Sequence, residues 1–146
     1  MRSVYLVDNS VLQRVHRSAE VAEALVALLD SGELGGCLPQ LLEEGYSARS
    51  AKEHQVITAA NADAKIFLPP DERVAEIAIE LQNRLFAAGM GRSVGVSDVQ
   101  IAATAIRHSG PAQSVTVVHY DADFENVARA WPEFAHRWIV PSGRVS

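Results

Sequence analysis

Two short apolar runs constrain the fold of this chain more than any other feature. Val4–Val7 and Val115–Val118 are dominated by β-branched, aliphatic and aromatic side chains and contain no charged residue. Runs of this kind are typical of strands buried on both faces, as in parallel sheets that helices cover on each side. Asp8 follows the first run directly and Asp121 follows the second after two residues, so both predicted strands lead to an acidic residue.

The rest of the chain alternates between helical and extended patterns. Helices are expected over residues 11–16, 18–30, 39–49, 52–60, 71–88, 97–106 and 124–131. Further strands are expected over residues 34–38, 65–68 and 138–140. Strands that alternate with helices predict an α/β fold, here a three-layer α/β/α sandwich with a central, mainly parallel sheet. No linker or internal repeat divides the sequence, so residues 1–146 are expected to form a single domain.

Two of the predicted helices have distinct local signals. Asp71 opens the clearest amphipathic helix, and Gly89 is expected to stop it. One face of that helix is predicted to consist of Val74, Ile77, Ala78, Leu81, Leu85 and Phe86. Ser97 and Gln100 have the spacing of a capping box, which predicts that the following helix starts at Ser97.

Composition excludes several classes of protein. The chain is 48% apolar and 21% charged, as in ordinary globular domains. No apolar run approaches the ~20 residues of a membrane span, and Asp8 interrupts the N-terminal run too early for a signal peptide. Cys37 is the only cysteine, so no intrachain disulfide is possible; a reducing, cytoplasmic setting and a buried thiol are expected.

The net charge of −5 argues against capture of nucleic acid by the whole surface. It leaves room for a local basic rim around an acidic site. An acidic pocket in a slightly acidic protein would need a divalent cation as its bridge to an anionic substrate.

Three acidic residues each have a purely structural alternative. Asp8 or Ser10 could cap the helix after the first strand. Asp98 falls in the first turn of a predicted helix, where the helix dipole favours a carboxylate. Asp121 could be the N-cap of the last helix, with Asp123 in its first turn.

Helical geometry separates Asp98 from an ordinary surface acid and Glu43 from Glu44. Ile101, Ala102 and Ala105 lie three, four and seven residues after Asp98, so its carboxylate shares a small apolar face and needs a partner there. Glu43 lies at the margin of the side that Leu38, Leu42, Tyr46 and Arg49 define, and Glu44 points nearly opposite. Glu43 is therefore the preferred site residue of the two.

Predicted strand ends and helix starts bring these acids to one edge of the sheet. In open α/β folds, ligands bind at the carboxyl edge of the parallel strands. Carboxylates that converge there would repel one another unless a cation compensated them. Oxygen ligands of this kind suit Mg²⁺ or Mn²⁺, and such ions support hydrolysis of phosphodiesters.

Four stretches together resemble a known family: Leu6–Leu12, Leu42–Arg49, Asp98–Ala105 and Val117–Phe124. Their order and spacing are similar to those of PIN-domain ribonucleases, specifically the VapC-type toxins of bacterial toxin–antitoxin pairs. The resemblance implies that four acids form the site: Asp8, Glu43, Asp98 and Asp121. Asp123 is expected as a fifth member. Of these, Asp8, Asp98, Asp121 and Asp123 are the expected metal ligands. It also implies Mg²⁺-dependent RNA cleavage, a homodimer and inhibition by a cognate antitoxin protein.

The sequence departs from that family at two positions. Asn9 stands where the family often has Thr, and Ser10 is expected to keep the hydroxyl in the turn. His119 stands where many members have Thr or Ser, and it is assigned no catalytic role. Cations for RNA phosphates are expected among Arg14, His16, Arg17, Arg49, Lys52, Arg92 and Arg107. Arg92, in a glycine-rich loop before Asp98, and Arg49 are the preferred RNA-binding candidates.

Other classes of protein remain as alternatives. A signalling receiver domain also gathers acids at the carboxyl edge of a parallel sheet, but it requires a Lys after a late strand, and no Lys follows Lys65. A phosphotransferase of the haloacid dehalogenase kind requires Asp-x-Asp after the first strand, where Asn9 and Ser10 follow Asp8 here. A PIN-like domain that only binds a partner is the third alternative.

Overall fold

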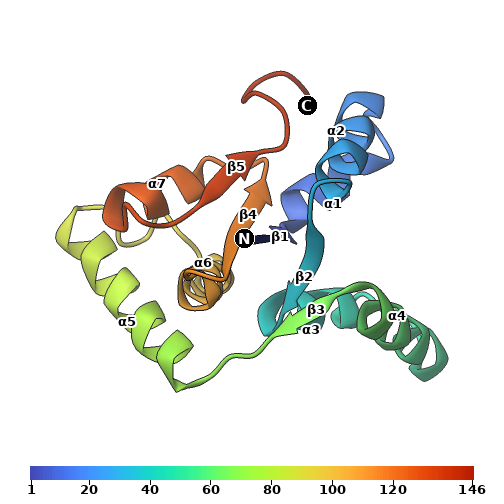
Figure 1. The fold of residues 1–146 in the computed structure, drawn as a ribbon, viewed down its shortest axis with the longest axis horizontal. Coiled ribbons are helices and arrows are strands. Elements are labelled where there is room, and N and C mark those ends of the chain that lie inside the picture. The colour runs from blue at the N-terminus through green and yellow to red at the C-terminus, as the bar shows by residue number, and fades with distance from the viewer.

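The computed structural model describes residues 1–146 as five strands and seven helices (Figure 1). The strands are β1 (Arg2–Val7), β2 (Glu33–Cys37), β3 (Ile66–Leu68), β4 (Gln113–His119) and β5 (His136–Trp138). The helices are α1 (Asn9–Val15), α2 (Ala19–Leu29), α3 (Leu38–Tyr46), α4 (Ala51–Ala64), α5 (Glu72–Ala87), α6 (Val96–His108) and α7 (Asp123–Ala130). The predicted alternation of strands and helices is confirmed.

All five strands are parallel, in the order β3-β2-β1-β4-β5. The two apolar runs are neighbours at the centre: β1 and β4 pair in register from Arg2 with Gln113 to Val7 with Val118. The residues that follow these two strands therefore leave the sheet at the same edge. This pairing is what brings the first and last acidic residues of the sequence together.

Helices cover both faces of the sheet, so the predicted three-layer sandwich is confirmed (Figure 1). Val115 and Val117 of β4 belong to the larger apolar core, which includes buried residues of α5, α6 and α7. Val118 points to the other face and belongs to a smaller core with residues of α1 and α2, such as Val11 and Val21. α3 and α4 lie at the end of the sheet formed by β2 and β3.

The helix expected to run to Arg49 is shorter than predicted. α3 ends at Tyr46, because Ser47 donates both its backbone N–H and its hydroxyl to the Glu44 carbonyl oxygen, at 3.2 and 2.6 Å. Ser50 then caps α4, which continues to Ala64. Arg49 consequently lies in the connection between the two helices.

Two further boundaries were predicted wrongly. Ser97 does not cap α6: Gly95 is the N-cap residue, since its carbonyl oxygen already accepts the Val99 N–H at 3.0 Å. The last strand, β5, covers His136–Trp138 instead of residues 138–140.

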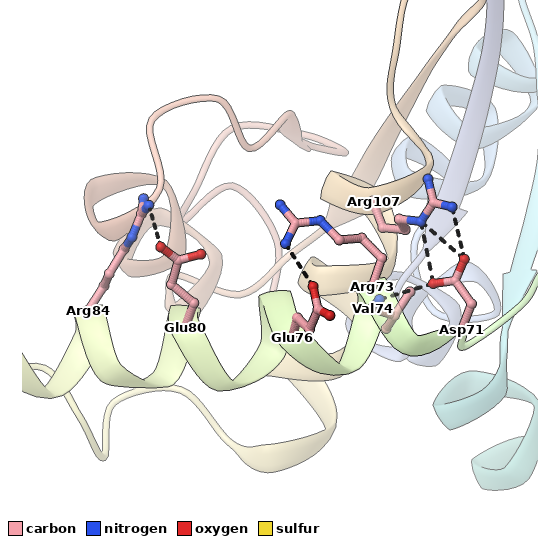
Figure 2. A network of polar contacts seen from close by, with 7 residues as sticks. All are labelled: Asp71, Arg73, Val74, Glu76, Glu80, Arg84 and Arg107. Atoms are coloured by element: carbon pink, nitrogen blue, oxygen red, sulfur yellow. Dashed lines mark hydrogen bonds and ion pairs between the residues drawn. The ribbon is translucent and has the colours of Figure 1, made fainter.

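α5 begins after Asp71, as predicted, and polar contacts join it to α6 (Figure 2). The Asp71 carboxylate accepts the Val74 N–H at 3.0 Å and forms an ion pair with Arg107 of α6, also at 3.0 Å. Two more ion pairs, Arg73–Glu76 and Arg84–Glu80, lie along the exposed face of the helix. Of these contacts only the Asp71–Arg107 pair links α5 to α6, the helix whose first turn carries Asp98.

The predicted apolar face of α5 is correct except at its end. Val74, Ile77, Leu81 and Leu85 are buried and Ala78 is partly buried, whereas Phe86 is 60% exposed. The Phe86 ring lies against Gly91, where an added Cβ would collide with it. Gly91 therefore allows the loop before α6 to fold back over the end of α5.

Cys37 is fully buried at the end of β2, as expected, and burial raises the pKa of its thiol to about 12. Its position is that of a core side chain and not of a reactive thiol. None of the helices is both long enough and apolar enough to span a membrane.

Candidate metal centre

Asp8 both caps a helix and lies at the carboxyl edge of the sheet. Its N–H donates to the Val118 carbonyl oxygen at 2.8 Å, which continues the pairing of β1 with β4. The side chain is nearly buried, and its Oδ2 accepts the Ser10 N–H at 3.1 Å and the Ser10 hydroxyl at 2.7 Å. Oδ1 has no donor within the protein. The capping alternative for Asp8 is thus correct. Asp8 is not one of the three carboxylates that lie within 4.8 Å of one another, although its charge helps to raise the pKa of Asp98.

Ser10 links Asp8 to the segment that follows β4. Its Oγ donates to Asp8 and accepts the backbone N–H of Tyr120 at 2.9 Å. Sequence analysis assigned the hydroxyl to the local turn and missed this contact across 110 residues. No local sequence pattern could reveal it, because the contact depends on the pairing of β1 with β4.

Asp121 and Asp123 lie in the turn between β4 and α7. The N-cap residue of α7 is Ala122, so the interpretation of Asp121 as the N-cap is wrong. Its Oδ1 instead accepts the Asp123 N–H at 2.9 Å, while its own N–H donates to Nδ1 of His119 at 3.2 Å. The Asp121 Oδ2 and both side-chain oxygens of Asp123 accept no hydrogen bond from the protein.

Asp98 reaches the same place from the first turn of α6. The carboxylates of Asp98, Asp121 and Asp123 each offer one oxygen atom, and these three atoms lie within 4.8 Å of one another. The small apolar face expected beside Asp98 is confirmed, since Ile101 and Ala102 are buried in the larger core. Two segments far apart in sequence thus bring together a group of ligand atoms of the size that a single cation requires.

Electrostatics show that these carboxylates repel one another. Burial raises the pKa of Asp98 to about 7, and the charges of Asp8, Asp121, Asp123 and Glu43 add to the effect in that order. Burial and the charge of Asp121 also raise the pKa of Asp123. None of the six ion pairs in the structure involves any of these five acids. The cluster therefore has no countercharge from the protein.

The two glutamates of α3 differ in their partners, although they do not face opposite sides as predicted. Glu44 forms an ion pair with Lys65 at 2.6 Å, whereas Glu43 is exposed and forms none. Glu43 is outside the group of three carboxylates and acts on Asp98 through its charge. Both glutamates line a cavity of about 350 Å³ beside the carboxyl end of β1.

Gln40 is a buried polar residue that sequence analysis did not single out. Its Nε2 donates to the Val7 carbonyl oxygen at 2.9 Å, and its Oε1 accepts the Cys37 thiol at 3.4 Å. The amide therefore holds the end of β1 against α3, immediately before Asp8.

The basic residues named as RNA contacts fall into two groups. Arg92 and Arg49 are exposed and take part in no ion pair. Arg107 is engaged with Asp71. Arg14 donates to the Ser10 carbonyl oxygen at 2.6 Å, and its guanidinium lies 4.7 Å from the centre of the Tyr120 ring. Arg17 and Lys52 are likewise exposed and free of ion pairs, so the structure leaves four of the named cations available, Arg49 and Arg92 among them.

The comparison with known families decides the identity of the fold. The PIN domain profile matches residues 5–130, which include Asp8, Glu43 and the cluster of Asp98, Asp121 and Asp123. The chain belongs to the PIN-domain family. This PIN domain has the parallel sheet and the carboxyl-edge acids expected from the resemblance, and the match favours that family over a receiver domain or a phosphotransferase.

Curated relatives match the PIN domain over nearly its full length. Ribonuclease VapC21 from Mycobacterium tuberculosis (strain H37Rv) is 36% identical over 143 residues, which cover 98% of this chain and 99% of the relative. Ribonuclease VapC51 from the same strain is 34% identical over 142 residues, covering 97% and 96%.

Solved structures share the fold at lower sequence identity. VapBC2 from Rickettsia felis, bound to a promoter DNA fragment, matches with a TM-score of 0.69 at 15% identity and covers 92% of this chain and 97% of its own. VapBC-1 from nontypeable Haemophilus influenzae matches with a TM-score of 0.69 at 16% identity, covering 93% and 98%.

Proposed function

We propose that this PIN domain is a Mg²⁺-dependent endoribonuclease, in which Mn²⁺ can replace Mg²⁺, and that it is the toxin of a toxin–antitoxin pair. The observation that carries the proposal is the cluster of Asp98, Asp121 and Asp123, which has no countercharge, in a chain 36% identical to a VapC ribonuclease. The cluster supplies the chemistry, and the family supplies RNA as the substrate.

The residues present fit a divalent cation. Asp8, Asp98, Asp121 and Asp123 would hold it, since each has at least one oxygen that no protein donor occupies. Hard carboxylate oxygens are the ligands that Mg²⁺ prefers. When bound, the cation would act as a Lewis acid that stabilises the charge of the transition state for phosphodiester hydrolysis, and it would lower the pKa of bound water.

Hydrogen bonds and an ion pair within the chain determine which carboxylate oxygens are available to a cation. Ser10 occupies Oδ2 of Asp8 and leaves Oδ1 for a ligand. The charge of Glu44 is compensated by Lys65, which leaves Glu43 as the acid of α3 without a countercharge in the cavity that both line. We assign Asp8, Glu43, Asp98 and Asp121 as the catalytic set on these grounds.

The substrate's phosphates require cations that the acidic cluster lacks. Arg92 precedes Asp98 on the loop before α6, and Arg49 follows α3, which carries Glu43. Both are exposed and free of ion pairs, and we assign them to phosphate contacts. Substitution of either by Gln should weaken RNA binding and make it less dependent on salt.

Partner proteins are proposed from the exposed apolar side chains. Tyr46 is 93% exposed and Leu42 63%, and the two line one pocket on α3, as an apolar interaction surface would. Val56 of α4 is 61% exposed. We assign the chain a cytoplasmic antitoxin partner and a homodimeric state. Light scattering on the isolated chain should give twice 15.8 kDa, and a single-chain mass at high concentration would contradict the homodimer.

The central experiment compares RNA cleavage by wild type, Asp8→Asn and Asp121→Asn. Each substitution should reduce Mg²⁺-dependent cleavage by at least about a hundredfold, because it removes a charged ligand. Asp63→Asn is the matched control, since Asp63 is exposed on α4 and should leave cleavage unchanged. Cleavage by Asp8→Asn at the wild-type rate would contradict the proposal. A well-folded wild type that never cuts RNA would favour the domain that only binds a partner.

A further inference from the structure

A buried pair of histidines lies directly behind the carboxylate cluster. His119 is the last residue of β4, has no exposed surface and is two residues before Asp121. Its ring centre lies 5.0 Å from that of Phe124 and 4.9 Å from that of Trp138. His136 of β5 is stacked against it at 5.1 Å, and their rings are joined through Nε2 of His119 and Nδ1 of His136 at 2.8 Å. The proposed chemistry makes no use of either ring.

The hydrogen bonds around His119 specify where its proton lies. The backbone N–H of Asp121 can only donate, so Nδ1 of His119, 3.2 Å away, must carry a lone pair. A neutral imidazole then has its proton on Nε2, which donates to Nδ1 of His136. A proton on both nitrogens of His119 would bring two donors face to face in a site with no exposed surface. One arrangement of protons therefore satisfies both contacts.

This arrangement controls the direction in which the chain leaves β4. The next two backbone N–H groups, those of Tyr120 and Asp121, donate to side chains: to Ser10 Oγ at 2.9 Å and to His119 Nδ1. No neighbouring strand holds these two N–H groups. The Asp121 carboxylate follows from that turn, and its Oδ1 in turn accepts the Asp123 N–H.

We infer that His119, held by His136, is a positioning residue that fixes the backbone of Asp121 and thereby the placement of two of the three clustered carboxylates. The inference rests on the proposed metal site. It assigns a role to a residue for which sequence analysis found none. Groups that orient metal ligands in this way typically change metal affinity by about 10- to 100-fold when removed.

Asn and Gln at position 119 separate the two contacts of the ring. The Oδ1 of Asn stands near the position of Nδ1, so His119→Asn keeps an acceptor for the Asp121 N–H and loses the contact with His136. The longer Gln places its amide near Nε2, so His119→Gln keeps a donor toward His136 and loses the acceptor for Asp121. If His119 positions Asp121, metal binding should survive in His119→Asn and be weakened in His119→Gln. If His119 only fills the core, the two variants should not differ in this way.

The test measures Mn²⁺ binding by calorimetry, without RNA, on the full chain and both variants. We expect His119→Asn to bind within about threefold of wild type and His119→Gln to bind at least about tenfold more weakly. Hydrogen exchange of the Asp121 amide should be faster in His119→Gln alone. Equal binding by the two variants, or weaker binding by Asn than by Gln, would overturn the inference.

Nitrogen-15 NMR of the wild-type histidines supplies a readout that requires no variant to fold. His119 should show a protonated Nε2 and a bare Nδ1, and a proton on Nδ1 would overturn the inference. A wild type that shows the expected tautomer but binds no Mn²⁺ would overturn the proposed metal site instead, so the two failures are distinguishable.

Discussion

The pKa of the Asp98 carboxyl reflects both its own burial and the charges of the neighbouring acids. Its pKa is raised to about 7 from an ordinary value of 3.8, first by burial and then by neighbouring acids. Without a cation, the folded protein keeps a proton on Asp98 that the unfolded chain releases near its ordinary pKa. Folding stability contributed by this group therefore falls as the pH rises from about 4 to about 7.

Asp98→Asn should raise the stability of the metal-free protein at pH 8, because the amide carries no charge to repel its neighbours. The gain is expected to be about 1 to 2 kcal/mol after allowance for solvent screening of this half-buried group. It should shrink toward pH 4, where the native carboxyl is protonated. Thermal unfolding in a chelator, at both pH values, measures the difference. The same variant should lose RNA cleavage, and a lower melting temperature at pH 8 would contradict the electrostatic account.

Ser10→Ala should loosen the link between the first and last acids of the site. It removes the hydroxyl donor to Asp8 and leaves the Tyr120 N–H without its acceptor, at a cost of about 1 to 3 kcal/mol. We expect a lower melting temperature and weaker Mn²⁺ binding. Ser31→Ala is the matched control: its hydroxyl bonds the Leu28 carbonyl oxygen and pairs with Tyr5 away from the site. Equal Mn²⁺ binding by wild type and Ser10→Ala would show that the link has no role in the site.

At this scale the sequence identified the acids better than their partners. Asp98 could be singled out by the small apolar residues three, four and seven positions after it, and Asp121 by the buried strand before it. The contacts of Ser10 with Tyr120 and of His119 with His136 could not, since both join segments whose proximity depends on strand pairing. Individual acids are visible locally, whereas the residues that orient them become visible only in the fold.

Among the elements, β2 shows why a weak strand signal can belong to a central part of the sheet. Gly35 and Gly36 made this strand difficult to predict, yet both are buried between β1 and β3. A Cβ at Gly35 would stand 2.7 Å from Cγ1 of Val4 and 3.3 Å from Cδ2 of Leu6. Glycine is required there by the close packing over β1, and strand propensity is secondary.

Gly35→Ala should therefore destabilise the protein by about 1 to 3 kcal/mol through overpacking. Chemical denaturation measures the change directly. Gly110→Ala is the control, because a Cβ at that exposed position meets no atom within 4 Å. If the two substitutions had equal effects, packing against Val4 would not explain the glycine.

The contacts at the start of α5 can be separated with two substitutions of Asp71 (Figure 2). Asn is also a good N-cap, so Asp71→Asn keeps the bond to the Val74 N–H and loses the charge that Arg107 pairs with. Asp71→Ala loses both. The melting temperature should fall more for Ala than for Asn, and RNA cleavage per folded molecule should stay at the wild-type level. Equal melting temperatures for the two variants would show that the cap contributes nothing.

Element boundaries were the least predictable feature of the secondary structure, and the causes are specific. α3 ended early because Ser47 satisfies the Glu44 carbonyl oxygen, and α6 started early because Gly95 takes the position of the cap. Such choices depend on small differences between competing local hydrogen bonds. The strands buried on both faces and the α5 face gave stronger signals, because burial affects many residues at once.

For the whole molecule, the class of fold could be predicted from the two apolar runs and from the alternation of strand and helix patterns along the chain. The order of the strands did not, since periodicity carries no information about which strands are neighbours. The central pair joins residues more than a hundred positions apart in the sequence, from Arg2 with Gln113 to Val7 with Val118. Asp121 and Asp123 reach the site only because β4 pairs with β1 in this register. Asp98 reaches it because α6 packs beside that pair.

A chain that ends at residue 112 should therefore have no nuclease activity, although it retains Asp8, Glu43 and Asp98. It lacks β4 and with it the partner of the whole length of β1. Circular dichroism and RNA cleavage on this fragment, with the full chain as control, check the expectation. Cleavage by the fragment would show that the site does not require Asp121 or the central strand pair.

The pairing of β1 with β4 also sets the moment at which activity can arise during protein synthesis. Translation makes β1 (Arg2–Val7) more than a hundred residues before β4 (Gln113–His119), so β1 has no central partner during that time. Under the proposed function, a nascent polypeptide should therefore cut no RNA until β4 and the acids that follow it have been made. The distance in sequence between the two central strands thus postpones assembly of the carboxylate cluster until the chain has been synthesised beyond Asp123.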